Sequence, residues 1–213
     1  MDNKILLKKL EIEDLYEVTE IHLASFPQSI ISKLGKEAVI KYYEWQFTSA
    51  IDLYAIGAYR DDKMVGCCFG GVFFAALSGY LYRHRGFIAK RLFFQPWLFF
   101  NPTLLKKIFH GFYIQVKYSI NKRKFKTFKS VNDDHHFGIL EIASAPSARG
   151  LGVGRFLMDH SEKYARENNF KIMCLTVRPE NRNAVQFYEH IGWVKEGDLE
   201  SWQGRMRKVL VHE

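Results

Sequence analysis

The spacing of apolar and polar residues predicts a chain that mixes strands with helices. Short apolar runs predict strands, and apolar residues repeated every three or four positions predict helices. The predicted strands are Lys4–Leu10, Leu53–Tyr59, Met64–Phe74, Phe137–Ala145, Lys171–Val177, Trp193–Gly197 and Met206–Val211. The predicted helices are Glu13–Ser25, Lys36–Phe47, Gly152–Asn168 and Asn183–Ile191. Because a strand–helix–strand unit needs a right-handed crossover, residues 137–177 predict a parallel pair, and we expect an α/β fold with a mixed sheet.

One uncharged stretch needs a separate test. From Met64 to Tyr82 there are 19 residues without a charge, which is long enough for a membrane helix. The stretch contains four glycines, and the preceding Arg60-Asp61-Asp62-Lys63 is typical of a hairpin turn. We therefore predict a buried strand pair rather than a membrane span.

Length, N-terminus and cysteines favour a single cytoplasmic domain. The 213 residues suit one domain over 1–213. The first residues have no apolar run behind their lysines, so no signal peptide is predicted. Cys67, Cys68 and Cys174 show neither C-x-x-C spacing nor an even number, which favours reduced thiols in the cytoplasm.

The charge is distributed unevenly along the chain. Residues 75–130 hold twelve Lys or Arg, no Asp or Glu, and 14 of the 33 aromatic residues. The rest of the chain has 19 basic and 23 acidic residues, although the whole carries a net charge of +8. This shift predicts an inserted segment over 75–130 with a partner of its own.

Within this segment, Asn101-Pro102 is typical of a helix start. Apolar residues at helical spacing then predict an amphipathic helix over Thr103–Ser119. Four uses of the segment stay open: a lid over the acceptor site, an element lying on an anionic membrane, an RNA-binding surface, or an internally packed helical subdomain. Nucleic acid is the least favoured, because no RNA-binding module is recognisable.

A glycine-rich segment, Ala148-Arg149-Gly150-Leu151-Gly152-Val153-Gly154-Arg155, lies between a predicted strand and a predicted helix. Glycines let the backbone bend tightly, and a helix start offers unpaired N–H groups to a phosphate. Dinucleotide loops have Gly-x-Gly-x-x-Gly and Walker loops end in Gly-Lys-Ser/Thr; neither pattern is present. The segment predicts a diphosphate site, against the alternative of a tight turn without a ligand.

Two motifs together resemble those of the GNAT N-acetyltransferases. Arg149-x-x-Gly152-x-Gly154 is similar to the acyl-CoA diphosphate loop of that family. At the expected distance follows Asn181-x-x-Ala184-x-x-Phe187-Tyr188-x-x-x-Gly192-Trp193, similar to the family's second signature. The resemblance covers residues 137–198 by motif and 1–74 by element order only. It implies a mixed, mostly antiparallel sheet flanked by helices, with a basic aromatic helical insertion before the fourth strand.

Four positions depart from the family pattern. Trp193 stands where Phe is usual, and Ser144-Ala145 stand where Val-Asp is frequent. Gly138 occupies a position where some members carry a catalytic Glu, so the base is not assigned by the motif.

The resemblance implies acetyl-CoA as co-substrate and no metal. Its pantetheine arm would bond backbone groups around Ile142, Ala143 and Ser144. Its diphosphate would lie on the loop of Arg149, Gly150, Leu151, Gly152, Val153, Gly154 and Arg155. Asn181 would either bond CoA or cap the following helix.

Tyr188 and Glu141 are the predicted acid and base. Tyr188 matches the family's tyrosine and would protonate the departing thiolate; the alternative is a core tyrosine beside Phe187. Glu141 lies in an apolar strand, where loss of water makes a carboxylate a better proton acceptor; a solvent-facing side chain or a water chain are its rivals. His135 and His136, beside Asp133-Asp134, offer a base or a metal ligand, but a solvated turn is favoured.

We expect an N-acetyltransferase acting on a primary amine of a small acceptor. The runs Ile21–Pro27 and Leu34-Gly35 loosely resemble members associated with bacterial surface-polysaccharide synthesis, which favours an amino sugar for a cell-surface glycan. Protein or peptide N-acetylation, and a non-catalytic CoA-binding peripheral membrane protein, are the alternatives. The expected location is the cytoplasm, with the inner face of the membrane and a homodimer left open.

Overall fold

The computed structural model describes residues 5–49, 52–72, 76–100 and 136–210, together with residues 105, 106, 109 and 113. In these residues seven strands form one sheet in the order β1-β2-β3-β4-β5-β7-β6. The strands are β1 (Leu6–Lys9), β2 (Asp52–Arg60), β3 (Lys63–Val72), β4 (His136–Ser144), β5 (Ile172–Thr176), β6 (Val194–Lys195) and β7 (Arg205–Val209). Only the β4–β5 pair is parallel among them, so the predicted mixed, mostly antiparallel sheet is confirmed.

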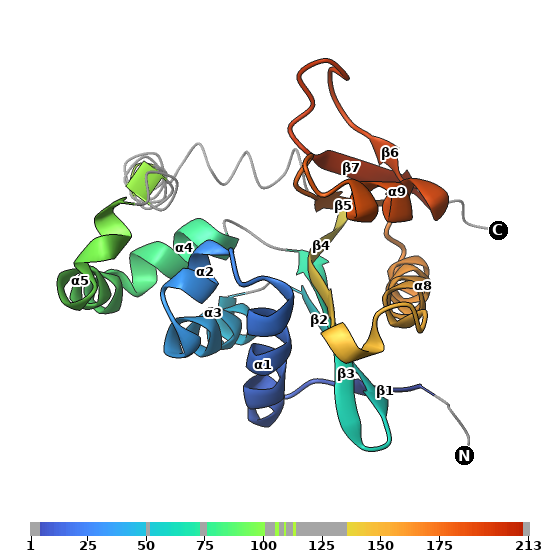
Figure 1. Ribbon diagram of the computed structural model, residues 1–213. Coiled ribbons are helices and arrows are strands. Elements are labelled where there is room, and N and C mark those ends of the chain that lie inside the picture. The colour runs from blue at the N-terminus through green and yellow to red at the C-terminus, as the bar shows by residue number, and fades with distance from the viewer. Residues whose placement is uncertain are drawn as a thin grey trace.

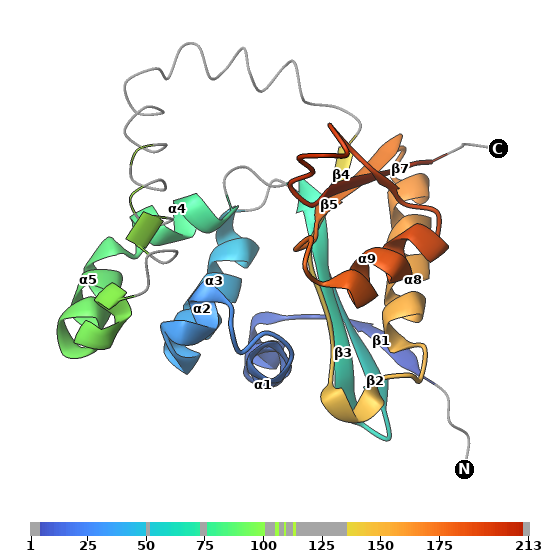
Figure 2. The same ribbon diagram turned by 45° about the horizontal axis from the view of Figure 1, so that its top comes forward.

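Helices cover both faces of the sheet (Figures 1 and 2). On one face lie α1 (Leu15–Ser25), α2 (Ile30–Lys33), α3 (Lys36–Ser49), α4 (Ala76–Arg83) and α5 (Arg85–Phe94). On the other lie α8 (Val153–Glu167) and α9 (Arg182–His190). The described residues also form three short 3-10 helices, η1 (Ile12–Asp14) before α1, η2 (Pro96–Phe100) after α5 and η3 (Pro146–Ala148) before α8.

The alternation of side chains along the strands divides the core into two layers. Buried Cys67 packs among residues of α1 and α3, whereas its neighbour Cys68 packs on the α8 side, with its sulfur 3.4 Å from the Ser161 hydroxyl. Successive residues of a strand point to opposite faces, so a central strand with helices on both sides is apolar throughout. This explains the long uncharged run that begins at Met64.

The predicted hairpin of β2 and β3 is confirmed, and the uncharged stretch is divided between β3 and α4. No helix within the described ranges is long and apolar enough to cross a membrane. The predicted strand Met64–Phe74 ends at Val72 in the structure. The helix predicted over Thr103–Ser119 lies largely outside the described residues; its described members Leu105, Lys106, Phe109 and Tyr113 are helical.

The pairing of β4 determines where a cavity can form. β4 pairs with β5 only from His136 to Ile139, while it continues along β3 as far as Ser144. Beyond Ile139, β4 and β5 therefore diverge. On the open side of β4, every second residue has backbone N–H and C=O groups that no neighbouring strand uses.

The β3–β4 register also shifts by one residue between Phe69 and Gly70, which makes Leu140 an extra residue in β4. Before this bulge, Phe137 and Ile139 point into the α8 layer. After it, Ala143 points into the α1 layer. Regular alternation would place all the odd-numbered residues of β4 on one face. The bulge therefore turns the second half of the strand over, as bulges next to functional sites often do.

Candidate active site

A cavity of about 840 Å³ lies where β4 and β5 diverge. One wall comes from the end of α1 and the segment that leads to α2. The other wall comes from the end of β5 and from α9, and residues Ile139–Ile142 of β4 lie between the two. A space of this size accommodates a small ligand.

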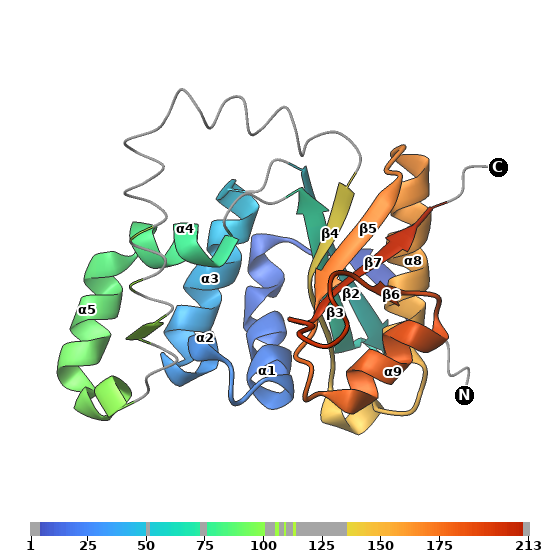
Figure 3. The same ribbon diagram turned by 90° about the horizontal axis from the view of Figure 1, so that it is seen from above.

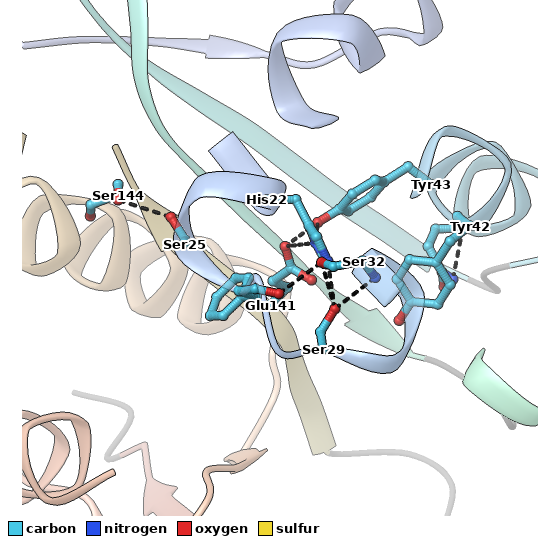
Figure 4. A network of polar contacts seen from close by, with 10 residues as sticks. His22, Ser25, Ser29, Ser32, Tyr42, Tyr43, Glu141 and Ser144 are labelled. Atoms are coloured by element: carbon cyan, nitrogen blue, oxygen red, sulfur yellow. Dashed lines mark hydrogen bonds and ion pairs between the residues drawn. The ribbon is translucent and has the colours of Figure 1, made fainter. Parts of the chain in front are cut away.

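Two carboxylates line this cavity, the exposed Glu180 and the largely buried Glu141, and the bulge aims Glu141 at the α1 layer. Its Oε1 accepts a hydrogen bond from the Tyr43 hydroxyl and lies 2.9 Å from His22 Nδ1 (Figure 4). The side chain is only 12% exposed. Within the described part of the chain, its second oxygen, Oε2, has no hydrogen-bond partner. One oxygen is thus fixed by the protein, while the other is available to a ligand.

A chain of hydrogen bonds leads from Glu141 to the α1–α2 segment (Figure 4). His22 is buried, and its second nitrogen, Nε2, lies 3.1 Å from the Ser29 hydroxyl. Ser29 caps α2 by accepting the Ser32 amide at 3.0 Å, and the two hydroxyls are 2.8 Å apart. The Ser32 hydroxyl donates in turn to the Phe26 carbonyl at 2.7 Å. The short helix α2 therefore holds Ser29 against His22.

Tyr43 holds the carboxylate from α3. It is fully buried, with its ring against Phe69 at a centroid distance of 4.6 Å. Burial, followed by the nearby Glu141 carboxylate, raises the pKa of Tyr43 well above its usual value of about 10. The phenol therefore stays protonated at neutral pH and acts as a hydrogen-bond donor to Glu141.

Tyr188 lies on the opposite wall, on α9. It is almost fully buried, and its ring packs against Phe187 and Trp193 at 5.2 and 6.0 Å. Tyr188 lines the cavity, and its hydroxyl has no hydrogen-bond partner within the described part of the chain. Burial raises the pKa of Tyr188 above its usual range, so it is a proton donor near neutral pH. The sequence offered a catalytic acid or a core tyrosine beside Phe187 as alternatives. Tyr188 packs on Phe187 and also lines the cavity, and its role as the acid stays a prediction.

Asn181 caps α9 and also lines the cavity. Its side-chain oxygen accepts the Ala184 amide at 3.3 Å, an N-cap bond. The capping alternative is thus confirmed, while the bond to CoA stays a prediction. The cap fixes the first turn of the helix that carries Tyr188.

The glycine-rich loop has the backbone that its sequence predicts. Gly150 and Gly152 have φ of 79° and 75°, the left-handed region that favours glycine. α8 begins at Val153, and the N–H groups of its first turn have no acceptor in the helix itself. Gly154 lies inside the helix, where an added Cβ would be 3.8 Å from the Ser144 hydroxyl. The loop therefore adjoins the end of β4 and presents its amides and the positive end of α8.

The two arginines of the loop differ. Arg149 is exposed at the end of η3. Arg155 Nε binds both carboxylate oxygens of Asp159 at 2.8 and 2.9 Å, so its charge is already paired one turn along α8. Leu151 is 49% exposed beside them. Residues 149–155 do not line the cavity but continue from its β4 side, so their contact with a diphosphate stays a prediction.

The three predicted β4 contacts are placed differently. Ile142 lines the cavity, whereas Ala143 is buried in the α1 layer. The Ser144 carbonyl accepts a bond from the Ser25 hydroxyl at 3.1 Å, which ties the end of α1 to the end of β4. Further along the same strand, His136 is exposed at the start of β4, and Asp133, Asp134 and His135 lie outside the described residues.

Sequence reasoning did not find His22, Tyr43 and Ser29 as functional residues. His22 and Tyr43 lie on predicted helices and are separated from Glu141 by 119 and 98 positions, so no local motif links them. A polar His within the apolar face of Glu13–Ser25 was the one signal that pointed to a buried partner.

A sequence profile described as the acetyltransferase (GNAT) family matches residues 15–193, most of the chain. The chain belongs to this family. The resemblance seen in the motifs is therefore confirmed and extends into the N-terminal half.

Two curated relatives match shorter stretches. An uncharacterised N-acetyltransferase of Methanocaldococcus jannaschii is 30% identical over 71 residues, 33% of this chain and 31% of the relative. The catalytic subunit of the N-terminal acetyltransferase B complex of Schizosaccharomyces pombe is 34% identical over 58 residues, 27% of this chain and 32% of the relative. The chain thus matches about a third of the length of each.

Solved structures share the fold. The PaiA N-acetyltransferase of Thermoplasma acidophilum, solved in complex with coenzyme A, superposes with a TM-score of 0.57 and 15% identity over 97% of this chain and 99% of that one. At this identity, the similarity establishes the fold but not the substrate, which has to be inferred from the residues of the site.

Proposed function

We propose that this chain is an acyl-CoA-dependent N-acetyltransferase that transfers acetyl from acetyl-CoA directly to a primary amine. The observation that carries the proposal is the position of Glu141 and Tyr188 in one cavity, at the point where β4 leaves β5. A proton acceptor and a proton donor facing one space are what aminolysis of a thioester requires.

In this mechanism the amine nitrogen attacks the thioester carbonyl carbon, so a C–N bond forms and the C–S bond breaks. Glu141 takes the proton that the amine loses, through its unbonded Oε2. Tyr188 gives its proton to the departing sulfur and regains one from solvent. A backbone N–H on the open side of β4, near Ile142, stabilises the charge that develops on the carbonyl oxygen.

Acetyl-CoA would lie along the divergence of the two strands. The left-handed glycines at 150 and 152 shape the loop, and the first amides of α8 fit a diphosphate. Arg149 is exposed and adds positive charge, whereas Arg155 would first have to leave Asp159. The Thermoplasma acidophilum homologue was solved with coenzyme A, which supports this ligand.

His22 and Tyr43 serve as positioning residues for Glu141. Each bonds its Oε1, so the carboxylate is held in the wall of the cavity, while Oε2 has no hydrogen-bond partner among the described residues. His22 also bonds Ser29 at 3.1 Å, which offers the abstracted proton a path toward the α1–α2 segment.

An amino sugar destined for a cell-surface glycan is the favoured acceptor. The acceptor-side wall includes the polar residues Ser25, Gln28 and Ser29, whose side chains suit the hydroxyls of a sugar. The loose resemblance of Ile21–Pro27 to polysaccharide-associated members supports the same class. The free cysteines Cys67, Cys68 and Cys174 are consistent with a reducing compartment, the cytoplasm.

A protein or peptide N-terminus is the second candidate. It is favoured by the 34% identity to the Schizosaccharomyces pombe N-terminal acetyltransferase subunit over 58 residues. A peptide acceptor would enter by the same wall but would present a backbone rather than a ring of hydroxyls.

The test is an acceptor screen with acetyl-CoA and a free-thiol readout. The panel holds free and nucleotide-linked amino sugars, matched sugars without the amine, and short peptides with free or blocked N-termini. We expect the largest kcat/KM for an amino sugar and none for the amine-free sugars. A larger kcat/KM for peptides would move the assignment to the second candidate. If calorimetry finds no association with CoA or acetyl-CoA at millimolar concentration, the proposal fails entirely.

A further inference from the structure

The outer face of α5 and the turn η2 that follows it have no assigned role in the acetyl transfer. α5 lies at the outer edge of the helical layer, far from α8 and α9 (Figure 3). Its inner face packs on the core through buried Ile88 and partly buried Phe87 and Leu92. Leu98 of η2 is buried in the same layer. These contacts determine which side of α5 faces outward.

Polar contacts fix the same orientation. The Arg91 guanidinium lies 3.0 Å from the Glu37 carboxylate on α3. On α4, the Tyr80 hydroxyl donates to the Ala38 carbonyl at 3.0 Å. The segment is therefore anchored to α3, and its outward residues cannot turn inward without breaking the anchor.

The outward residues are basic and aromatic. We define the α5 surface as Arg85, Lys90, Phe93, Phe94, Trp97 and Phe100, all exposed. The four aromatic side chains are 77%, 65%, 62% and 87% exposed, in chain order. Phe94 follows Lys90 at four residues, so this ring and this charge lie side by side, while Arg85 and Phe93 lie further round the exposed half of the helix. Phe93 and Phe94 also contact each other edge to face at 5.3 Å.

The positive charge of the α5 surface indicates which class of partner it can bind. Residues 76–100 contain no Asp or Glu, so a second copy of the same surface would bring like charges together. Large exposed aromatics beside Lys and Arg are the composition of elements that lie at a lipid interface, with rings among the head groups and cations on anionic lipid. A purely solvated face would not keep four large aromatic side chains exposed within eight residues.

We propose that the α5 surface binds anionic lipid membranes, with its aromatic rings at the head-group level and Arg85 and Lys90 against the lipid phosphates. The inference does not depend on the proposed acetyl transfer. Together with the proposed acetyl transfer, it would place the amine acceptor site near a membrane.

The test is sedimentation of the full chain with phosphatidylcholine vesicles, with and without phosphatidylglycerol. We compare the wild type with Phe93→Ser/Phe94→Ser/Trp97→Ser and with Arg85→Gln/Lys90→Gln. The matched control is Val194→Ser/Leu199→Ser, which removes two hydrophobic side chains that are 53% and 72% exposed elsewhere. Thermal unfolding followed by circular dichroism checks that every variant is folded.

The expected result is at least tenfold stronger binding to the anionic vesicles, reduced about tenfold or more by either test variant and unchanged in the control. Added salt should weaken the wild type more than the Arg85→Gln/Lys90→Gln variant. Equal binding to both vesicles, no binding, or binding that survives the aromatic substitutions would overturn the proposal. So would binding of a single-stranded RNA that depends on the same three aromatic residues.

Discussion

The two walls of the cavity differ in whether their functional residues belong to recognisable sequence motifs. The wall of β5 and α9, with the adjoining β4–α8 loop, comes from a contiguous stretch with two recognisable motifs. The wall of α1 and the α1–α2 segment has no motif, and its residues meet Glu141 only through the fold. The residues of the proposed co-substrate side can therefore be predicted from motif spacing, whereas those of the acceptor side are recognised only from tertiary contacts.

The largest effect is expected where the two walls meet. Glu141→Gln keeps the shape and an acceptor for Tyr43 but cannot take up the amine proton, so kcat should fall about 1,000-fold. Affinity for acetyl-CoA, measured by calorimetry, should be unchanged. Glu167→Gln, an exposed carboxylate on α8, is the matched control and should keep full turnover. A Glu141→Gln enzyme with nearly normal kcat would show that another group is the base.

On the motif-bearing wall, Tyr188→Phe should lower kcat about 30-fold, because a thiolate leaves more easily than an amine and depends less on its acid. Since the pKa of Tyr188 is raised, the hydroxyl stays protonated beyond pH 10, and the wild-type kcat should show no loss from this group below that pH. Stopped-flow measurement of thiol release tests both. Unchanged thiol release at saturating substrates would exclude the acid role.

Gly152→Ala tests the contribution of the glycine-rich loop to the binding of CoA alone. Alanine at φ near 75° costs roughly 1–2 kcal/mol, so the loop should deform and affinity for CoA should fall about tenfold. Gly86→Ala is the control, since Gly86 has open space around it and no positive φ. Equal CoA affinity in the two variants would mean that the loop does not hold the diphosphate.

Ser29→Ala tests the other wall. Loss of the hydrogen bond to the acceptor costs about 1 kcal/mol, and the variant also loses the bonds of Ser29 to His22 and to the Ser32 amide, so KM for the acceptor should rise about fivefold or more while CoA affinity is unaffected. Ser32→Ala is the control, because Ser32 bonds Ser29 but does not line the cavity. Should Ser29→Ala weaken CoA instead, the division between the walls is wrong.

The smallest effect near neutral pH concerns the buried tyrosines, Tyr43 on one wall and Tyr188 on the other. Their folded-state pKa values lie above the unfolded value of about 10, so the folded state keeps their protons longer. Their contribution to the free energy of unfolding is therefore complete below pH 10 and is lost as the pH rises further. Urea titrations across this range should show that decline, and Tyr188→Phe should make it shallower. An identical slope in the variant would contradict this account.

Much of the fold follows from the pattern of the sequence. Strands such as β5 and helices such as α8 appear at their predicted positions because apolar spacing and glycine turns are local signals. The short α2 was not predicted, because its four residues carry no periodicity and its cap, Ser29, is one of many serines. α4 and α5 were not predicted as separate helices, and in α5 apolar residues occur on both faces, since Ile88 is buried while Phe93 and Phe94 are exposed.

The site divides in the same way. Tyr188, Asn181 and the glycine loop could be named from motifs, and Glu141 from its apolar strand. The direction in which Glu141 points could not be predicted, because alternation alone would put it on the face of Phe137 and Ile139. His22 and Tyr43 become visible only after that direction is known.

The extra residue at Leu140 has a consequence for how such a protein can change. The aim of the carboxylate depends on Leu140 staying outside the regular alternation of the strand, not on the chemistry of that residue. Deletion of Leu140 is expected to make β4 regular and to leave Glu141 opposite Phe69, still on the side of His22. Insertion of one residue between Leu140 and Glu141 would instead put the new residue opposite Phe69 and send Glu141 toward α8. A gain of length at this point, rather than a loss or a substitution, is therefore the event that would most readily switch the site off.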